Sequence, residues 1–99
     1  MFNKIPHKEI VEFTRVLSLL LYSRVSIIQA MELILKQTKN EKLKEIVKSI
    51  LKDIKSGSSL SKSFAKYPKV FADIFIANLK VGEETGEIAE VIGEYSLYL

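Results

Sequence analysis

NEKLKEIVKSILKDIKSG, residues 40–57, carries the clearest secondary-structure signal in the chain. Its apolar residues recur every three or four positions, namely at Leu43, Ile46, Val47, Ile50, Leu51 and Ile54. That spacing places them on one face of an α-helix, whereas the residues of a half-buried strand would alternate. Asn40 is a favoured N-cap, and Gly57 supplies the left-handed residue that commonly follows a helix. The stretch therefore predicts an amphipathic helix with one buried face.

The opposite face of this predicted helix is rich in lysine. Its cations are Lys44, Lys48, Lys52 and Lys55, and acidic residues are interleaved with them. Phosphate binding needs cations along one face, so a helical nucleic-acid-binding or regulatory module is the alternative interpretation of this helix. Because no arginine or exposed aromatic ladder accompanies the lysines, we expect no nucleic-acid partner. The face is instead interpreted as solvated or as a contact surface for protein.

Helical spacing continues through the rest of the chain, interrupted only by short turns. We expect helices from Pro6 or His7 to about Tyr22, from Ile27 to about Thr38 after the capping residue Ser26, from Ser58 or Ser59 to Pro68, from Ala72 or Asp73 to Gly86, and from Glu87 to the end of the chain. Short connections favour antiparallel packing of consecutive helices. The expected fold class is all-α, a compact antiparallel bundle of about six helices.

Length and composition set the scale of the molecule. The chain has 99 residues, of which 47% are hydrophobic and 27% charged, so residues 1–99 should form a single folded domain. The longest nearly continuous apolar stretch, Val16–Tyr22, is far shorter than the ~20 residues that span a bilayer. Within the first predicted helix, Leu19 widens the apolar stripe toward a second contact. The aromatic residues occur at helical spacing among aliphatic neighbours, which indicates core packing.

Charge is distributed unevenly along the chain. Residues 1–69 hold 14 Lys and Arg against 6 Asp and Glu, a net charge of +8. Residues 70–99 hold one Lys against 6 Asp and Glu, a net charge of −5. The last helix carries Glu87, Glu90 and Glu94 opposite its apolar side. The lysine face and this acidic face are therefore the two candidate partner surfaces.

Residues that could perform catalysis are scarce. His7 is the only histidine and there is no cysteine, so the Ser/His, thiolate and metal–histidine arrangements of common enzymes have no support. The chain also lacks a phosphate-binding G-x-x-x-x-G-K-[ST] loop, a G-x-G-x-x-G motif and the zinc motif H-E-x-x-H. We therefore expect no catalytic residue, no bound cofactor and no enzymatic activity.

Three glutamates near the predicted junction of the last two helices form the sharpest candidate for a metal site. Glu83, Glu84 and Glu87 offer carboxylate oxygens, which hard cations such as calcium prefer. Their spacing differs from that of the D-x-[DN]-x-[DN]-G calcium loop. In the structural interpretation, Glu87 favours the start of the last helix through the helix dipole, while Glu83 hydrogen-bonds a neighbouring turn. That interpretation assigns no metal ligand.

Five segments in order carry a resemblance to a known family. They are Phe13–Leu17 (FTRVL), Ser26–Met31 (SIIQAM), Gly57–Ser61 (GSSLS), Pro68–Phe71 (PKVF) and above all Val81–Ile88 (VGEETGEI). Together, over residues 8–99, they resemble the cytoplasmic domain of the type II secretion system F family, which includes the general secretion pathway protein F and the type IV pilus platform protein C. No single segment is decisive, but the ordered set with its spacing is specific.

The resemblance gives physical roles to five residues. Gly82 would let two helices approach closely, Gly86 would supply a left-handed turn, and Glu83 between them would tie that turn down. Gly57 and Ser59 belong to the turn before the short helix. One departure stands out, because the family usually has an Ala-Gly-Val-Pro-like turn where this chain has residues 23–26, SRVS.

The resemblance also implies a function without catalysis. Family members are polytopic inner-membrane proteins with two copies of this domain, so this chain is expected to be an excised copy, the first, lacking its transmembrane segments. The domain would face the cytoplasm and dock the secretion or pilus assembly ATPase and other inner-membrane components. Some members form dimers through it, so a homodimer is also expected among its arrangements, and bound metal at an acidic site is in keeping with the family. Secretion and pilus machines both use the domain.

Overall fold

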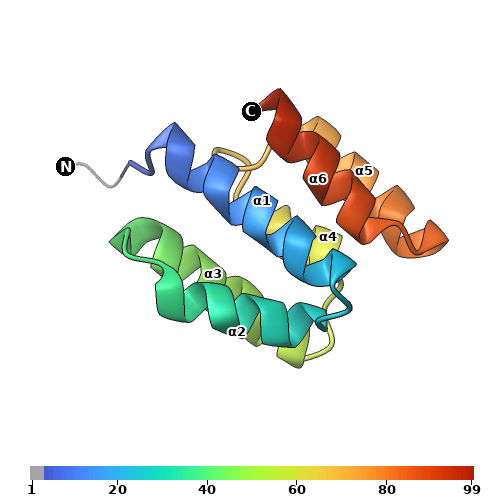
Figure 1. The fold of residues 1–99 in the computed structure, drawn as a ribbon, viewed down its shortest axis with the longest axis horizontal. Helices are drawn as coiled ribbons and strands as arrows, with labels where there is room; N and C mark the ends of the chain where they lie inside the picture. Colours follow the sequence, from blue (N-terminus) through green and yellow to red (C-terminus); the bar gives the residue numbers. More distant parts are fainter. Residues whose placement is uncertain (1–3) are drawn as a thin grey trace.

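A computed structural model describes residues 4–99 as six α-helices. Their bounds are α1 His7–Tyr22, α2 Ile27–Gln37, α3 Glu41–Lys55, α4 Leu60–Phe64, α5 Asp73–Thr85 and α6 Ile88–Tyr98. No strand occurs within the described residues. The predicted all-α fold of about six helices is thus confirmed (Figure 1). None of these helices combines the length and the apolar character that crossing a bilayer requires.

The helices pack as a closed ring. Each helix packs against the one that follows it in the chain, and α6 returns to pack extensively against α1. Figure 1 shows α1 between α6 on one side and α2 with α3 on the other. The two ends of the ring meet where the His7 ring hydrogen-bonds the carbonyl group of Leu99. As a result, α3 and α6 lie on opposite sides of the molecule.

An aromatic cluster fills the centre of the core, as the spacing of these residues predicted. Phe64 and Phe71 have ring centroids 4.7 Å apart, and Phe13 lies 6.1 Å from each. Phe75 extends the cluster to Tyr95, whose ring stacks on it at 3.9 Å with an interplanar angle of 8°. Offset and edge-on aromatic pairs add about 0.5–1.5 kcal/mol beyond their buried area. The cluster joins α1, α4, α5 and α6 to the segment that precedes α5.

Side-chain caps begin three of the helices, as expected from the sequence. The Ser26 hydroxyl accepts a hydrogen bond from the Gln29 N–H at 3.2 Å, and the Asn40 side chain accepts one from Leu43 at 2.9 Å. Of the two serines considered for the short helix, Ser59 is the cap, accepting from the Lys62 N–H at 3.2 Å. Each cap satisfies one of the backbone donors left free at a helix start.

The turn after α1 is built without glycine. Arg24 has φ 69°, the left-handed conformation that usually belongs to glycine at this position. The Val25 N–H donates to the Leu20 carbonyl at 3.0 Å and the Arg24 N–H to Leu21 at 3.1 Å. These two bonds form the same motif that closes α3 at Gly57, whose φ is 98°. The turn at residues 23–26 therefore ends α1 with a left-handed residue, as Gly57 ends α3.

The short helix is shorter than predicted. It ends at Phe64, with Ala65 as its C-cap, four residues before Pro68, which was expected to terminate it. A tighter turn follows the helix, in which the Tyr67 N–H donates to the Phe64 carbonyl at 3.0 Å. The Phe71 N–H then donates to Tyr67 at 2.9 Å, and this turn returns Phe71 to the ring of Phe64. The helix therefore ends before the chain reaches Pro68, where the chain turns and brings Phe71 into the aromatic cluster.

Candidate functional site

The side chain of Glu83 joins α5 to the start of α4. Its carboxylate accepts hydrogen bonds from the Leu60 N–H at 2.7 Å, the Ser61 N–H at 3.2 Å and the Ser61 hydroxyl at 2.6 Å. Ser59, the residue before α4, also accepts a hydrogen bond from a backbone N–H of this helix. The backbone donors at the start of α4 therefore have one acceptor nearby in the sequence, Ser59, and one distant in the sequence, Glu83. Glu83 thus hydrogen-bonds a neighbouring turn, while the expectation that it ties down its own turn is wrong.

The turn between α5 and α6 is closed by backbone groups. Gly86 has φ 79°, and the Gly82 carbonyl accepts from the Gly86 N–H at 2.8 Å and the Glu87 N–H at 2.9 Å. A Cβ on Gly82 would lie 3.1 Å from Val91 Cγ2 and 3.4 Å from the Glu87 carbonyl oxygen. Glycine at position 82 therefore allows α6 to lie close to the end of α5, and glycine at position 86 permits the reversal.

The three candidate metal ligands do not converge. Glu83 is engaged with α4, whereas Glu84 and Glu87 are exposed. Glu87 is the N-cap residue of α6, but its side chain makes no capping hydrogen bond. Among residues 4–99, no three His, Asp or Glu side chains are grouped closely enough to hold a metal ion. The junction therefore offers a structural hydrogen-bond network and no cation geometry.

The lysine face lies on the outside of α3. Lys44, Lys48 and Lys52 are exposed. Of the four lysines of this face, only Lys55 has an ion-pair partner within residues 4–99, namely Glu32 of α2 at 3.1 Å. These exposed cations leave the outer surface of the helix available to an anionic partner.

Asp53, the last acidic residue of α3, is engaged elsewhere. Its carboxylate accepts a hydrogen bond from the Lys66 ammonium at 2.7 Å. That hydrogen bond, together with the charge of Asp53, raises the pKa of Lys66 above its ordinary value. The pair links α3 to the turn after α4 and adds no free negative charge to the lysine face.

The acidic face lies on α6. Glu87, Glu90 and Glu94 are all exposed, and none of them takes part in an ion pair within residues 4–99. Their charges are therefore open to solvent or to a partner, on the opposite side of the molecule from the lysine face.

One helix contact was not anticipated from the sequence. Ser18 of α1 is 4% exposed, and its hydroxyl donates to the Ala89 carbonyl of α6 at 2.8 Å. A Cβ added to Gly93 would lie 2.7 Å from the Ser18 hydroxyl oxygen, closer than side chains normally approach. The signal was present, since Ser18 interrupts the apolar run of the first helix and Gly93 lies inside the last. The two residues lie far apart in the sequence, so no local pattern indicates that they meet.

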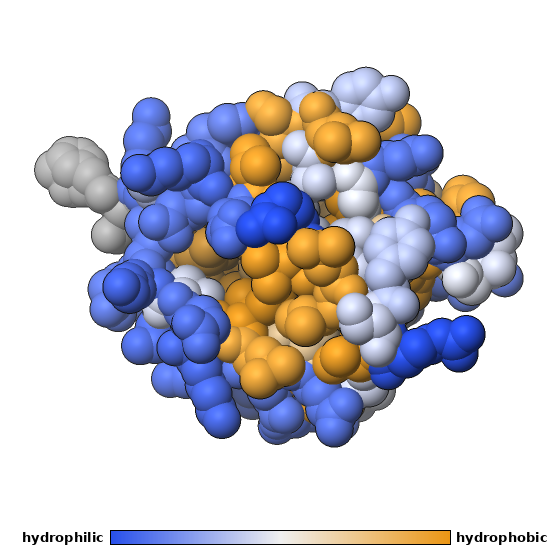
Figure 2. Space-filling view, viewed as in Figure 1, coloured by the Kyte–Doolittle hydropathy of each residue, from blue (hydrophilic) through white to orange (hydrophobic). Residues whose placement is uncertain are grey.

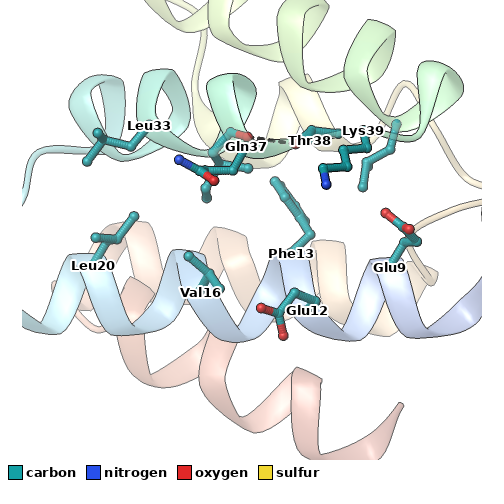
Figure 3. A pocket seen from close by; sticks show the side chains of 11 residues that line it. Glu9, Glu12, Phe13, Val16, Leu20, Leu33, Gln37, Thr38 and Lys39 are labelled. Carbon is teal, nitrogen blue, oxygen red and sulfur yellow. Dashed lines mark hydrogen bonds between the residues drawn. The ribbon is translucent and has the colours of Figure 1, made fainter.

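A hollow lies between α1 and α2 on the described surface. It has a volume of about 520 Å³, and Phe13, Val16, Leu20 and Leu33 supply apolar wall (Figure 3). The polar side chains around it include Glu9, Glu12, Thr38 and Lys39. Figure 2 shows apolar residues gathered at the centre of this face. Such apolar walls suit contact with another apolar surface.

The described residues thus form a small all-helical domain that carries exposed charged faces. Residues 13–99 match the family model described as Type II secretion system (T2SS), protein F. The chain belongs to this family.

The chain is also similar to type IV pilus assembly proteins. Protein PilC of Thermus thermophilus is 26% identical over 92 residues, which are 93% of this chain and 22% of the relative. Protein PilC of Pseudomonas aeruginosa is 24% identical over 96 residues, 97% of this chain and 26% of the relative. Protein PilC of Myxococcus xanthus is 22% identical over 97 residues, 98% and 23% respectively. The chain thus spans about a quarter of the length of these relatives.

Proposed function

We propose that this chain is a non-enzymatic platform domain of a type II secretion or type IV pilus machine. In this role it lies at the cytoplasmic face of the bacterial inner membrane and docks the assembly ATPase and other inner-membrane components. Membership of the T2SS protein F family supports a role in such machinery, and the names of the relatives point to pilus assembly. Membrane attachment would come from segments outside these 99 residues.

The observation that carries the proposal is the separation of charge across the ring of helices. Exposed lysines outnumber exposed glutamates on α3, whereas α6 carries exposed glutamates and no Lys or Arg. The two helices lie on opposite sides of the molecule (Figure 1). Complementary charge speeds the encounter of two proteins and selects their orientation more than it adds affinity. A domain with two oppositely charged faces can hold two different partners at once, which is what a platform requires.

Charge reversal on α3 tests which face docks the ATPase. The triple variant Lys44→Glu, Lys48→Glu, Lys52→Glu should lose capture of the assembly ATPase of the same machine in a pull-down at low salt. The loss is expected because three exposed cations become anions, and wild-type capture should itself weaken as salt screens the charges.

A matched control separates the face from the total charge. The triple variant Lys8→Glu, Lys39→Glu, Lys69→Glu changes net charge equally at exposed positions on other segments and should retain capture. Equal capture by wild type and both variants would remove the α3 face from the proposal. Sedimentation of the free chain in the same buffers reports whether a second copy occupies either face.

A further inference from the structure

Exposed apolar side chains are concentrated around α6. Seven large hydrophobic residues are exposed in the described part of the chain, and six of them line the two grooves beside this helix. Those six are Leu19, Tyr22 and Leu97 in the α1–α6 groove, and Ile74, Val81 and Tyr98 in the α5–α6 groove. Isolated apolar residues on a surface are ordinary, but residues gathered into neighbouring grooves commonly mark an interaction site.

The α5–α6 groove has the dimensions of a helix-binding site. Its volume is about 590 Å³, against about 370 Å³ for the α1–α6 groove. Ile74 and Val81 lie seven residues apart on α5, so the apolar wall is about 10 Å long at about 1.5 Å per residue, or two turns. Its floor includes the stacked rings of Phe75 and Tyr95. Two turns of a partner helix would place two or three apolar anchors along it.

Charge at the grooves selects the kind of partner. Glu94 lines both grooves and Glu90 lines one, and neither carboxylate has an ion-pair partner in residues 4–99. The nearby cation, Arg15, already pairs with Glu12 at 2.8 Å. A second copy of the chain docked through the same face would oppose two rows of carboxylates, which costs free energy. The lysine face of α3 would match this charge but exposes no large apolar residue to fill a groove.

We propose that the α5–α6 groove binds a cationic amphipathic helix of a partner protein. Apolar side chains of that helix would sit between Ile74, Val81 and Tyr98. Lys or Arg beside its apolar stripe would meet Glu94, which lines this groove, and Glu90, one turn earlier on α6 in the neighbouring groove. The inference rests on the proposed docking function and adds the partner's chemistry for the acidic side. Helix-in-groove recognition uses anchors at i, i+3 or i+4, and i+7, a spacing that this wall matches.

Peptide binding tests the inference directly. The probe is a fluorescent helical peptide of about 14 residues, four turns at about 3.6 residues each, with leucines on one face and lysines beside them. Fluorescence anisotropy with the 99-residue chain should detect binding that weakens with salt. Val81→Asp and the double variant Glu90→Lys, Glu94→Lys should each weaken binding about tenfold, the equivalent of ~1.4 kcal/mol. All three positions are exposed, so these variants should fold, as far-ultraviolet circular dichroism will verify.

Controls give each outcome a meaning. The double variant Glu41→Lys, Glu45→Lys changes charge equally at exposed positions of α3 and should bind the peptide like wild type. A peptide with glutamates in place of its lysines should bind at least tenfold more weakly. Equal binding of both peptides, or unchanged binding by the Glu90 and Glu94 double variant, would overturn the inference. If peptide binding gives such a result and the chain still captures the ATPase, only this inference fails. If the chain binds neither the peptide nor the ATPase, the proposed docking function fails as well.

Discussion

Removal of the Glu83 carboxylate should destabilise the domain more than removal of its neighbour Glu84. The Glu83→Ala variant leaves the Leu60 N–H, the Ser61 N–H and the Ser61 hydroxyl without their acceptor. Glu84, in contrast, is exposed and makes no side-chain hydrogen bond to described residues, so Glu84→Ala is the matched control. Both changes remove one negative charge from the same helical turn, so their difference isolates the hydrogen bonds.

The three hydrogen bonds set the size of the effect. A hydrogen bond to a charged group contributes about 1.5–3 kcal/mol, but contributions within one network do not add in full. All three are part-buried, so water can replace some of the lost acceptor, and Ser59 still caps α4. We expect Glu83→Ala to lower the free energy of unfolding by about 3 kcal/mol, and Glu84→Ala by less than about 0.5 kcal/mol. Glu83→Gln should cost about 1 kcal/mol, because one amide oxygen can still accept from the backbone.

Urea unfolding followed by circular dichroism measures these values. With a denaturant slope of about 1–3 kcal/mol/M, the midpoint of Glu83→Ala should fall by about 1–3 M. Hydrogen exchange gives the local test, since the amides of Leu60 and Ser61 should lose protection before the core does. Equal midpoints for Glu83→Ala and Glu84→Ala would refute the assignment of Glu83 as the residue that joins α5 to α4.

Three further predictions concern positions outside this junction. Gly93→Ala should lower the free energy of unfolding by about 1 kcal/mol, because the added Cβ would collide with the Ser18 hydroxyl. Adding Ser18→Ala should reverse most of that loss, and purely additive effects of the two changes in urea unfolding would contradict this. Arg24→Gly should raise stability by about 0.5–1 kcal/mol, since φ is 69° there; a lower thermal midpoint would be the contrary result. Lys66 has a pKa raised above 10.5, so its pair with Asp53 supports the fold below that pH and loses this contribution as pH rises through the raised value. Thermal midpoints should therefore fall less steeply above pH 10.5 in Asp53→Asn than in wild type, and equal slopes would count against the pair.

Local signals in the sequence predicted most of the fold. Ser26, Asn40 and Ser59 each accept from a backbone N–H three residues later, so the cap and its helix occupy one short segment. The apolar periodicity of α3 is equally local, and all of its predicted core residues except Ile54 are buried. Helix type and helix starts are therefore readable without knowledge of the tertiary structure.

The parts that the sequence did not predict depend on distant partners. Glu83 bonds groups 22 and 23 residues away, and Ser18 bonds a carbonyl 71 residues away. No periodicity connects such positions, because the match is made only when packed helices bring them together. The end of α4 was missed for the same reason, since the turn that follows it is joined to the return of Phe71 onto Phe64. The grooves beside α6 likewise depend on how three helices are arranged around one another.

Closure of the helix ring by α1 and α6 has a consequence for how the domain can be connected. Because His7 contacts Leu99, the start of α1 and the end of α6 lie at a common edge of the domain. A short linker from Leu99 to His7, with new ends opened at the exposed turn around Gly57, would give a circular permutation that keeps every helix contact. The domain could therefore be inserted as one unit into another chain, with entry and exit side by side.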